Sequence, residues 1–288
     1  MTLVYREYDQ DGLDKQYERL VADDSYAIFD RWRARSDASA ETRPVMLDIP
    51  YGPAPTEKLD VFPAKDPDAP ILIYIHGGYW IWKDKADFRF VAEGVVDAGV
   101  TLVVINYALT PDHDMDEIVR QVRAAVAFVW KKAGTAIPGD QDRLFLSGHS
   151  AGGHLTAIAA ATNWPSFDPK LPAGIVAGGI AVSGLYDLEP IRLSYLNETV
   201  GLDAAMAHRS SPLHAIRPAM PPLTLVVGGA ESDEFKRQQQ SFAAALTAAG
   251  NTVLSEEVAG LHHFAVIETI ADHGSQLQRA VLRRIGLG

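Results

Sequence analysis

The sequence predicts an α/β fold, with a mostly parallel central sheet and helices on both of its faces. Short, continuously apolar runs alternate with helical segments along most of the chain, as expected when parallel strands are buried on both sides. The 288 residues include 47% hydrophobic and 22% charged residues, ordinary values for a globular chain with a sizeable core. No repeat, low-complexity tract or linker divides the sequence. We therefore expect a single domain over residues 1–288.

The N-terminal part of the chain precedes this alternation. Residues 8–35 carry apolar side chains at roughly helical spacing, which predicts one or two amphipathic helices. We expect residues 1–40 to form a small helical segment that packs over the functional site and is not a domain of its own. Two β-like runs follow, VMLDIPYG (45–52) and EKLDVFPA (57–64).

The regular alternation occupies the rest of the chain. Its predicted strands are ILIYIHGG (71–78), TLVVINYAL (101–109), RLFLSGH (143–149), AGGIAVSGLYDL (177–188), PLTLVVGGAES (222–232) and TVLSEEVAG (252–260). Its predicted helices lie near 86–98, over 115–134, 154–164 and 234–250, and in a C-terminal segment. Residues 184–218 do not follow this rhythm, so we expect an excursion above the sheet there.

Composition excludes several classes of partner and site. The net charge is −11 and the Lys and Arg residues form no basic cluster, which argues against a nucleic-acid partner. The chain has no cysteine, which removes disulfides, a thiol nucleophile and thiolate metal sites. The N-terminus lacks a signal-peptide pattern, and the most apolar stretch, GIVAGGIAVSG, is too short to span a bilayer. We expect a cytoplasmic protein without a membrane partner.

One motif carries nucleophilic chemistry. Gly148-His149-Ser150-Ala151-Gly152 is a G-x-S-x-G sequence between an apolar strand and an apolar helix. A strand that turns sharply into a helix strains the middle residue and lifts the serine hydroxyl clear of the sheet. The N–H of Ala151 would begin the helix, where it can stabilise negative charge. This context favours a catalytic Ser150 over an incidental serine in a glycine-rich turn.

A nucleophilic serine needs a base and an acid. In this architecture they follow the serine in the order acid, then His, on loops at the carboxyl ends of strands. The acidic loop GGAESDEF (228–235) follows the strand LTLVV, and the loop AGLHHFAV (259–266) follows the last strand. One of His262 and His263 can take the Ser150 proton and later deliver it to the leaving group.

The loop HGGYWIW (76–82) combines adjacent glycines with three aromatic residues. In this kind of fold it supplies the second half of the oxyanion hole. Gly77 and Gly78 would let backbone N–H groups approach the substrate oxygen, and losing one such donor typically costs about 3–4 kcal/mol. We predict that Gly77, Gly78 and Ala151 form the oxyanion hole, with Tyr79 and Trp80 beside the reacting carbonyl. A tight turn with its aromatic residues packed in the core is the alternative.

These segments resemble the arylformamidase (kynurenine formamidase) family of α/β-hydrolases. HGGYW is similar to that family's H-G-G-x-W signature, where lipases and hormone-sensitive-lipase-like esterases usually carry H-G-G-G. The resemblance extends to INYALTPDHDMDEIVRQV, SGHSAGGHL, SGLYDLEPI, EFKRQ and the N-terminal LDKQYERL, DIPYG and EKLDVF. It therefore covers nearly the whole chain and implies an α/β-hydrolase fold.

The resemblance also implies roles for single residues. Ser150 becomes the nucleophile. The family's D-H-F falls on His262-His263-Phe264, which makes His263 the base and His262 a neighbour.

The acid is less directly implied. Family members carry an Asp where this chain has Glu231, and Asp233 lies two positions on. Glu is an accepted acid in this fold. Asp233 has a structural explanation, since Ser232 would cap the next helix and Asp233 would lie in its first turn. We favour Glu231 and keep Asp233 as the alternative.

The resemblance implies hydrolysis of an N-formyl arylamine such as N-formylkynurenine through an acyl-serine intermediate, with neither metal nor organic cofactor. Tyr79 and Trp80 would restrict the acyl side to something small. Trp80, Trp82 and Tyr186 could pack on an aromatic leaving group, or each ring could belong to the core.

Two other functions stay open. A short-acyl carboxylesterase would use the same residues, and relative turnover of aryl amides and simple esters would separate the two. A catalytically silent fold used for binding is the third hypothesis, against which the apparently complete triad counts. The segment Asp112-His113-Asp114 precedes a helix and is better explained as a solvated helix start than as a metal site. The N-terminal helices could form a lid, the contact of a homodimer, or both.

Overall fold

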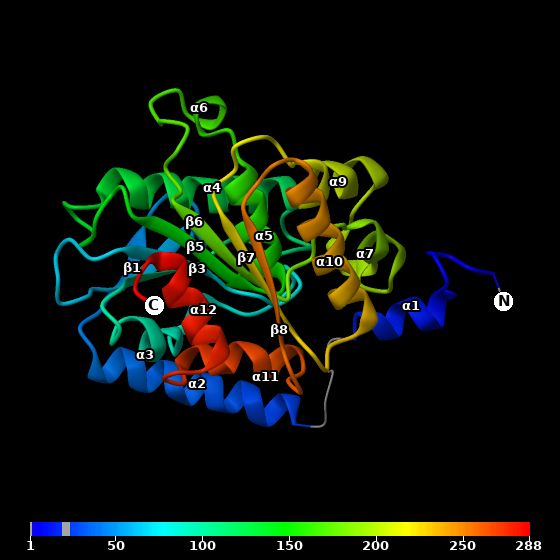
Figure 1. Ribbon diagram of the computed structural model, residues 1–288, viewed down its shortest axis with the longest axis horizontal. Helices are drawn as coiled ribbons and strands as arrows, with labels where there is room; N and C mark the ends of the chain where they lie inside the picture. The colour runs from blue at the N-terminus through cyan, green and yellow to red at the C-terminus, as the bar shows by residue number, and fades with distance from the viewer. Residues whose placement is uncertain (1, 19–23) are drawn as a thin grey trace.

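A computed structural model of the protein describes residues 2–18 and 24–288 and contains an eight-stranded sheet (Figure 1). The strand order is β1-β2-β4-β3-β5-β6-β7-β8. The β1–β2 and β2–β4 pairs are antiparallel, and the pairs from β4 through β3 to β8 are parallel. The strands are β1 (Met46–Pro50), β2 (Lys58–Phe62), β3 (Ile71–Ile75), β4 (Thr101–Ile105), β5 (Leu144–His149), β6 (Gly178–Val182), β7 (Leu223–Gly228) and β8 (Val253–Val258). The predicted mostly parallel sheet is confirmed.

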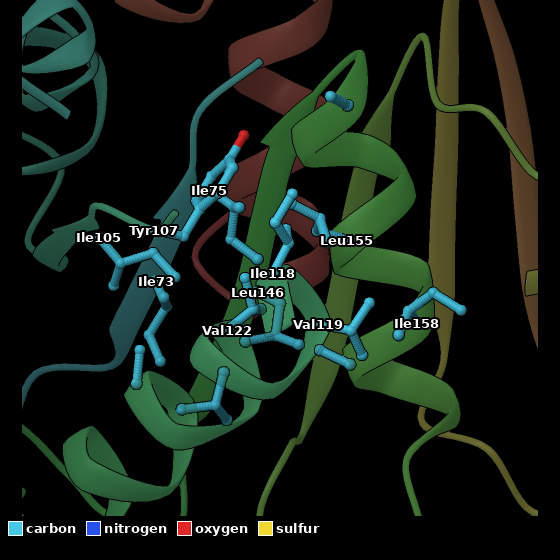
Figure 2. Close-up of a cluster of buried hydrophobic side chains, with 14 of the residues drawn as sticks. Ile73, Ile75, Ile105, Tyr107, Ile118, Val119, Val122, Leu146, Leu155 and Ile158 are labelled. Atoms are coloured by element: carbon cyan, nitrogen blue, oxygen red, sulfur yellow. The ribbon is translucent and has the colours of Figure 1, made fainter. Parts of the chain in front are cut away.

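Burial explains why the central strands are continuously apolar. Every residue of β3 to β7 is buried, because successive side chains point to opposite faces and both faces are covered. In β3, Ile73 and Ile75 enter one hydrophobic core, whereas Leu72 and Tyr74 enter another. Figure 2 shows the first of these cores, where strand side chains meet those of the helices on that face.

Helices form a layer on each face of the sheet (Figure 1). One face carries α4 (Met115–Lys132) and α5 (Ala151–Ala161). The other carries α2 (Ser25–Thr42), α3 (Val91–Val95), α11 (His263–Glu268) and α12 (Gln276–Ile285). The remaining helices are α1 (Gln10–Gln16), η1 (Lys85–Phe88), α6 (Trp164–Phe167), α7 (Glu189–Leu193), α8 (Asn197–Val200), α9 (Ala204–Arg209), η2 (Pro212–His214), α10 (Asp233–Ala248) and η3 (Thr269–Ala271). Among the described residues, no helix is long and apolar enough to cross a membrane.

Three regions refine the expectations. The helix predicted near 86–98 is instead a 3₁₀ turn, η1, followed by the short α3. Residues 184–218 carry α7, α8, α9 and η2 between β6 and β7. The N-terminal helices are α1 and α2, and part of the predicted helical span, residues 19–23, lies outside the described residues.

Both N-terminal helices reach the end of the sheet where the candidate site lies. On the α1 side, the hydroxyl of Tyr17 donates to Glu234 at 2.9 Å and accepts from Gln238 at 2.9 Å, which joins α1 to α10. On the α2 side, the ring of Phe29 meets those of Trp82 and Phe264 edge-on, with centroids 5.3 and 4.8 Å apart. Aromatic packing thus attaches α2 to the loop after β3 and to α11.

Candidate active site

Ser150 lies in a strained turn between β5 and α5. Its backbone has φ 58° and ψ −120°, a conformation that L-residues rarely adopt. The turn is possible because glycines flank it. A Cβ at Gly152 would lie 1.9 Å from the carbonyl oxygen of Ile75, and one at Gly148 would lie 2.4 Å from that of Gly152. The end of β3, the end of β5 and the start of α5 therefore approach one another more closely than any residue with a Cβ would allow at Gly148 or Gly152.

Glu231 and His263 form a buried pair beside this turn. Nδ1 of His263 lies 2.6 Å from Oε2 of Glu231, whose side chain is fully buried. The other oxygen, Oε1, accepts from the Ser183 hydroxyl at 2.5 Å and from the Gly228 N–H at 2.7 Å. Because a carboxylate only accepts hydrogen bonds, Nδ1 carries the proton of a neutral His263. Nε2 is then the unprotonated ring nitrogen of His263 and can accept a proton.

Asp233 lies outside this arrangement. Its side chain is 80% exposed and pairs with Lys236 at 3.2 Å in the first turn of α10. Ser232 occupies the N-cap position, but its hydroxyl donates to the carbonyl oxygen of Gln16 at 2.8 Å and does not cap the helix. Of the two candidate acids, only Glu231 contacts His263 in the structure.

The imidazole of His263 is held between two rings. The rings of His149 and Phe235 each lie 4.5 Å from it, centroid to centroid. His149 also places Nε2 2.8 Å from the carbonyl oxygen of His263. Burial, and next the nearby His263, lower the pKa of His149 well below its usual value, so His149 is neutral and donates this bond. His262 caps α11 by accepting from the N–H of Phe264 at 3.3 Å.

A narrow cavity connects these groups. Its volume is about 20 Å³, little more than one water molecule needs. The lining comprises Phe29, Trp32, Gly77, Gly78, Tyr79, Trp82, Lys83, Phe88, His149, Ser150, His263 and Phe264. The predicted nucleophile, the predicted base and both glycines of the loop after β3 therefore border one space.

The loop after β3 approaches the Ser150 turn closely. In the parallel register Ile75 lies beside Gly148, so the two loops leave the sheet side by side. A Cβ at Gly77 would lie 2.7 Å from the carbonyl oxygen of His149. Gly78 has φ +113° and its carbonyl accepts from the N–H groups of Ile81 and Trp82, which closes the loop. The first N–H groups of a helix have no partner within it, which applies to Ala151 at the start of α5.

Known proteins are similar to this chain in sequence and in fold. The BD-FAE family model matches residues 59–246. Kynurenine formamidase from Danio rerio is 34% identical over 98% of this chain and 98% of its own length. The enzyme of the same name from Salmo salar is 32% identical, again over 98% of both chains. The chain belongs to the kynurenine formamidase family of α/β-hydrolases.

Further comparisons agree with this assignment. Esterase LipC of Mycobacterium tuberculosis is 28% identical over 69% of this chain and 54% of its own length. A candidate thioesterase from Silicibacter sp. TM1040 superimposes with a TM-score of 0.81 at 28% identity, over 93% of this chain and 98% of that one. A Pyrobaculum calidifontis esterase shares the fold alone, with a TM-score of 0.71 at 17% identity over 93% and 94% of the two chains. This chain is therefore a hydrolase that acts on an amide or an ester.

Only some of the aromatic residues that the sequence suggested for the pocket of this hydrolase border the cavity. Tyr79 and Trp82 line the cavity, but Trp80 and Tyr186 are not among the described residues around it. Trp80 is fully buried and meets His154 edge-on, with ring centroids 5.0 Å apart. Tyr186 stacks on Phe242 at 4.4 Å. For these two rings, core packing is what the structure shows.

Several residues at the site have no signal in a local motif. Phe29 and Trp32 reach the cavity from α2, and Lys83 reaches it from the loop after β3. Ser183 supports Glu231 from the end of β6. The spacing of Phe29 and Trp32 marks an apolar helix face in the sequence, but not what that face covers.

The Asp112-His113-Asp114 segment has a structural role. The Asp114 carboxylate caps α4 by accepting from the N–H of Glu117 at 2.9 Å. Among the described residues, no cluster of three or more His, Asp or Glu side chains is suited to hold a metal ion.

Proposed function

We propose that this hydrolase cleaves an N-formyl arylamine, such as N-formylkynurenine, through an acyl-serine intermediate on Ser150. The observation that carries the proposal is the 2.6 Å contact between Glu231 and His263, because His263 borders the same cavity as Ser150. The proposed class of substrate is supported by the similarity to kynurenine formamidases over 98% of the chain.

In the proposed reaction, Nε2 of His263 takes the Ser150 proton while the serine oxygen attacks the formyl carbon. Glu231 holds His263 in the required tautomer and stabilises the imidazolium that forms. The N–H groups of Gly78 and Ala151, beside Gly77, hold the tetrahedral oxyanion. His263 then protonates the departing arylamine, and water activated by the same histidine releases formate and restores Ser150.

The size of the cavity favours a small acyl group. A volume of about 20 Å³ beside Ser150 suits a formyl group, which adds only a hydrogen to the reacting carbonyl. Rings of Phe29, Trp32 and Tyr79 border this space and would exclude longer acyl chains. An aromatic leaving group is too large for this volume and would extend out of it.

An ester of a short acid is the second candidate substrate. The observation in its favour is the similarity to esterase LipC, which covers 69% of the chain. The same residues would act in the same order, with an alcohol leaving in place of an amine.

The deciding measurement is kcat/KM for N-formylkynurenine and for p-nitrophenyl acetate, on the wild type and on Ser150→Ala. We expect the formamide to be strongly preferred and both activities to be lost in the variant. Turnover of the ester but not of the formamide would support the proposed catalytic residues and would contradict the formamide as substrate. A fluorophosphonate probe should label the wild type but not Ser150→Ala, and a folded wild type that stays unlabelled would contradict both candidates.

A further inference from the structure

Lys83 places a positive charge at the active-site cavity. It is the one Lys, Arg, Asp or Glu side chain among the described residues that line this space. The other lining groups are aromatic rings, glycine backbone, Ser150 and two histidines. In a chain of net charge −11, a single cation beside the reacting serine is a feature that the proposed hydrolysis does not use.

The ammonium group of Lys83 is held by rings and not by carboxylates. Its Nζ lies 3.9 Å from the ring centroid of Phe29, 4.5 Å from that of Trp82 and 6.0 Å from that of Trp32. Cation–π contacts of this kind fix the position of an ammonium but leave its charge in place. Holding it there beforehand lowers the entropic cost of binding an anion.

Two nearby lysines differ in how their charge is balanced. Lys85 is buried and pairs with Asp48 at 2.9 Å and Asp60 at 2.8 Å. Lys83 forms no ion pair with any carboxylate in the described part of the chain. The acid that acts on it most, Asp87, is itself paired with Arg33 at 3.0 Å.

Two further properties of Lys83 fit a binding role. Its backbone has φ +79°, where glycine or asparagine would be less strained, so a long cationic side chain is kept there at a conformational cost. Partial burial is the main influence on its ammonium and lowers its pKa. An anion arriving at this point would offset the lost hydration and form charge-assisted hydrogen bonds with the three N–H donors.

We propose that Lys83 is a specificity residue that selects substrates with a carboxylate on the leaving group. This inference rests on the proposed function, because a formyl group has no substituent that could carry an anion. The negative group must then belong to the arylamine. Because Lys83 and the rings of Phe29 and Trp82 that hold its ammonium line the cavity beside Ser150, a leaving group attached to the same carbonyl can bring its carboxylate to this ammonium.

The test compares formamidobenzoates with their neutral formamidobenzamide counterparts, each as the ortho, meta and para isomer. For at least one isomer, we expect kcat/KM for the formamidobenzoate to exceed that for the matching formamidobenzamide by about tenfold, mainly through a lower KM. Lys83→Met keeps an apolar stem against the rings and should bring this ratio close to one. Lys83→Arg should retain part of the preference, and Lys132→Met, which removes an exposed charge elsewhere, should retain all of it.

The outcomes separate the two proposals. A wild-type ratio near one for all three isomers, or a ratio that survives in Lys83→Met, would overturn the role of Lys83 while formanilide hydrolysis stands. Absence of turnover with every formanilide would remove the amide reaction and this inference with it. If Lys83→Met does not fold, the wild type decides, because at about 1 M salt the Debye length falls to about 3 Å. A preference that does not fall with salt contradicts the assignment.

Discussion

At the scale of single residues, the active site depends on which acid contacts His263. Glu231 is buried and accepts from His263, Ser183 and Gly228, whereas Asp233 points into solvent. Glu231→Gln should lower kcat by about 10⁴-fold, because an amide can stabilise the wrong tautomer of His263 and cannot stabilise its imidazolium. Steady-state kinetics on the preferred substrate measures this. Asp233→Asn is the control and should keep kcat within about twofold of the wild-type value, because it changes an exposed side chain that does not contact His263. A large loss of kcat in Asp233→Asn, with little loss in Glu231→Gln, would instead identify Asp233 as the acid.

The sequence could suggest Glu231 because a helix start explains Asp233 separately. It could not show Ser183, whose hydroxyl reaches Glu231 across 48 positions of the chain. Nor could it separate Trp80 from Trp82. Both follow the same pair of glycines, but positive φ values at Tyr79, Trp80 and Lys83 set the direction of each side chain. Such backbone conformations depend on tertiary contacts that no local pattern encodes.

A pH dependence of stability belongs to His154, in the first turn of α5. Burial lowers its pKa from 6.5 to about 4, while its Nε2 donates to the carbonyl oxygen of Ser210 at 2.7 Å. Below pH 6.5 the unfolded chain binds a proton here that the folded chain does not bind until about pH 4. The contribution of His154 to the free energy of unfolding is thus fully present above pH 6.5 and falls through this window, by on the order of 3 kcal/mol.

Urea unfolding of the wild type and His154→Gln across this pH window measures the effect. The glutamine can still donate to Ser210 but does not titrate, so the decrease in the free energy of unfolding should be smaller in the variant. His113→Gln, at an exposed position, should follow the wild type. Equal decreases in the wild type and His154→Gln would show that other groups cause the pH dependence.

At the scale of elements, the approach of α5 to β3 decides whether the Ser150 turn can form. Alanine normally stabilises a helix relative to glycine by about 1 kcal/mol. At Gly152 the opposite should hold, because the added Cβ would lie 1.9 Å from the carbonyl oxygen of Ile75. Gly152→Ala should lower the melting temperature and reduce kcat/KM by about a hundredfold or more, since small displacements of reacting groups are costly.

The matched control is Gly174→Ala, where an added Cβ meets no atom within 4 Å. Thermal unfolding and kcat/KM should both stay at wild-type values in this variant. A Gly152→Ala enzyme with unchanged activity and stability would mean that the β3–α5 contact can relax. The G-x-S-x-G motif predicted the sharp turn from strand to helix, but it did not show that Gly152 would pack against β3. The arrangement of α7 to α9 has no comparable signal, since short helices of four to six residues carry too little periodicity.

At the scale of the whole molecule, the N-terminal segment completes a site that the sheet alone would leave open. Strands and their loops supply Ser150, Glu231 and His263, as the alternating pattern predicted. Part of the wall of the cavity, the rings of Phe29 and Trp32, comes from α2, more than a hundred residues earlier in the chain than Ser150. An amphipathic pattern over residues 8–35 predicts buried faces, but the surface that receives them is formed by loops whose conformations the sequence leaves undetermined.

This wall should set the size of the acyl group. The ring of Phe29 contacts those of Trp32, Trp82 and Phe264, so Phe29→Ala removes the shared member of the cluster and should cost about 3 kcal/mol of stability. The cavity should widen toward α2, and the ratio of kcat/KM for p-nitrophenyl butyrate to that for the acetate should rise severalfold while formamide turnover falls. Tyr26→Ala changes a ring on the same helix that is 67% exposed, and it should leave the ratio unchanged. An unaltered ratio in Phe29→Ala would mean that the loop after β3 limits the acyl group by itself and that α2 serves the fold alone.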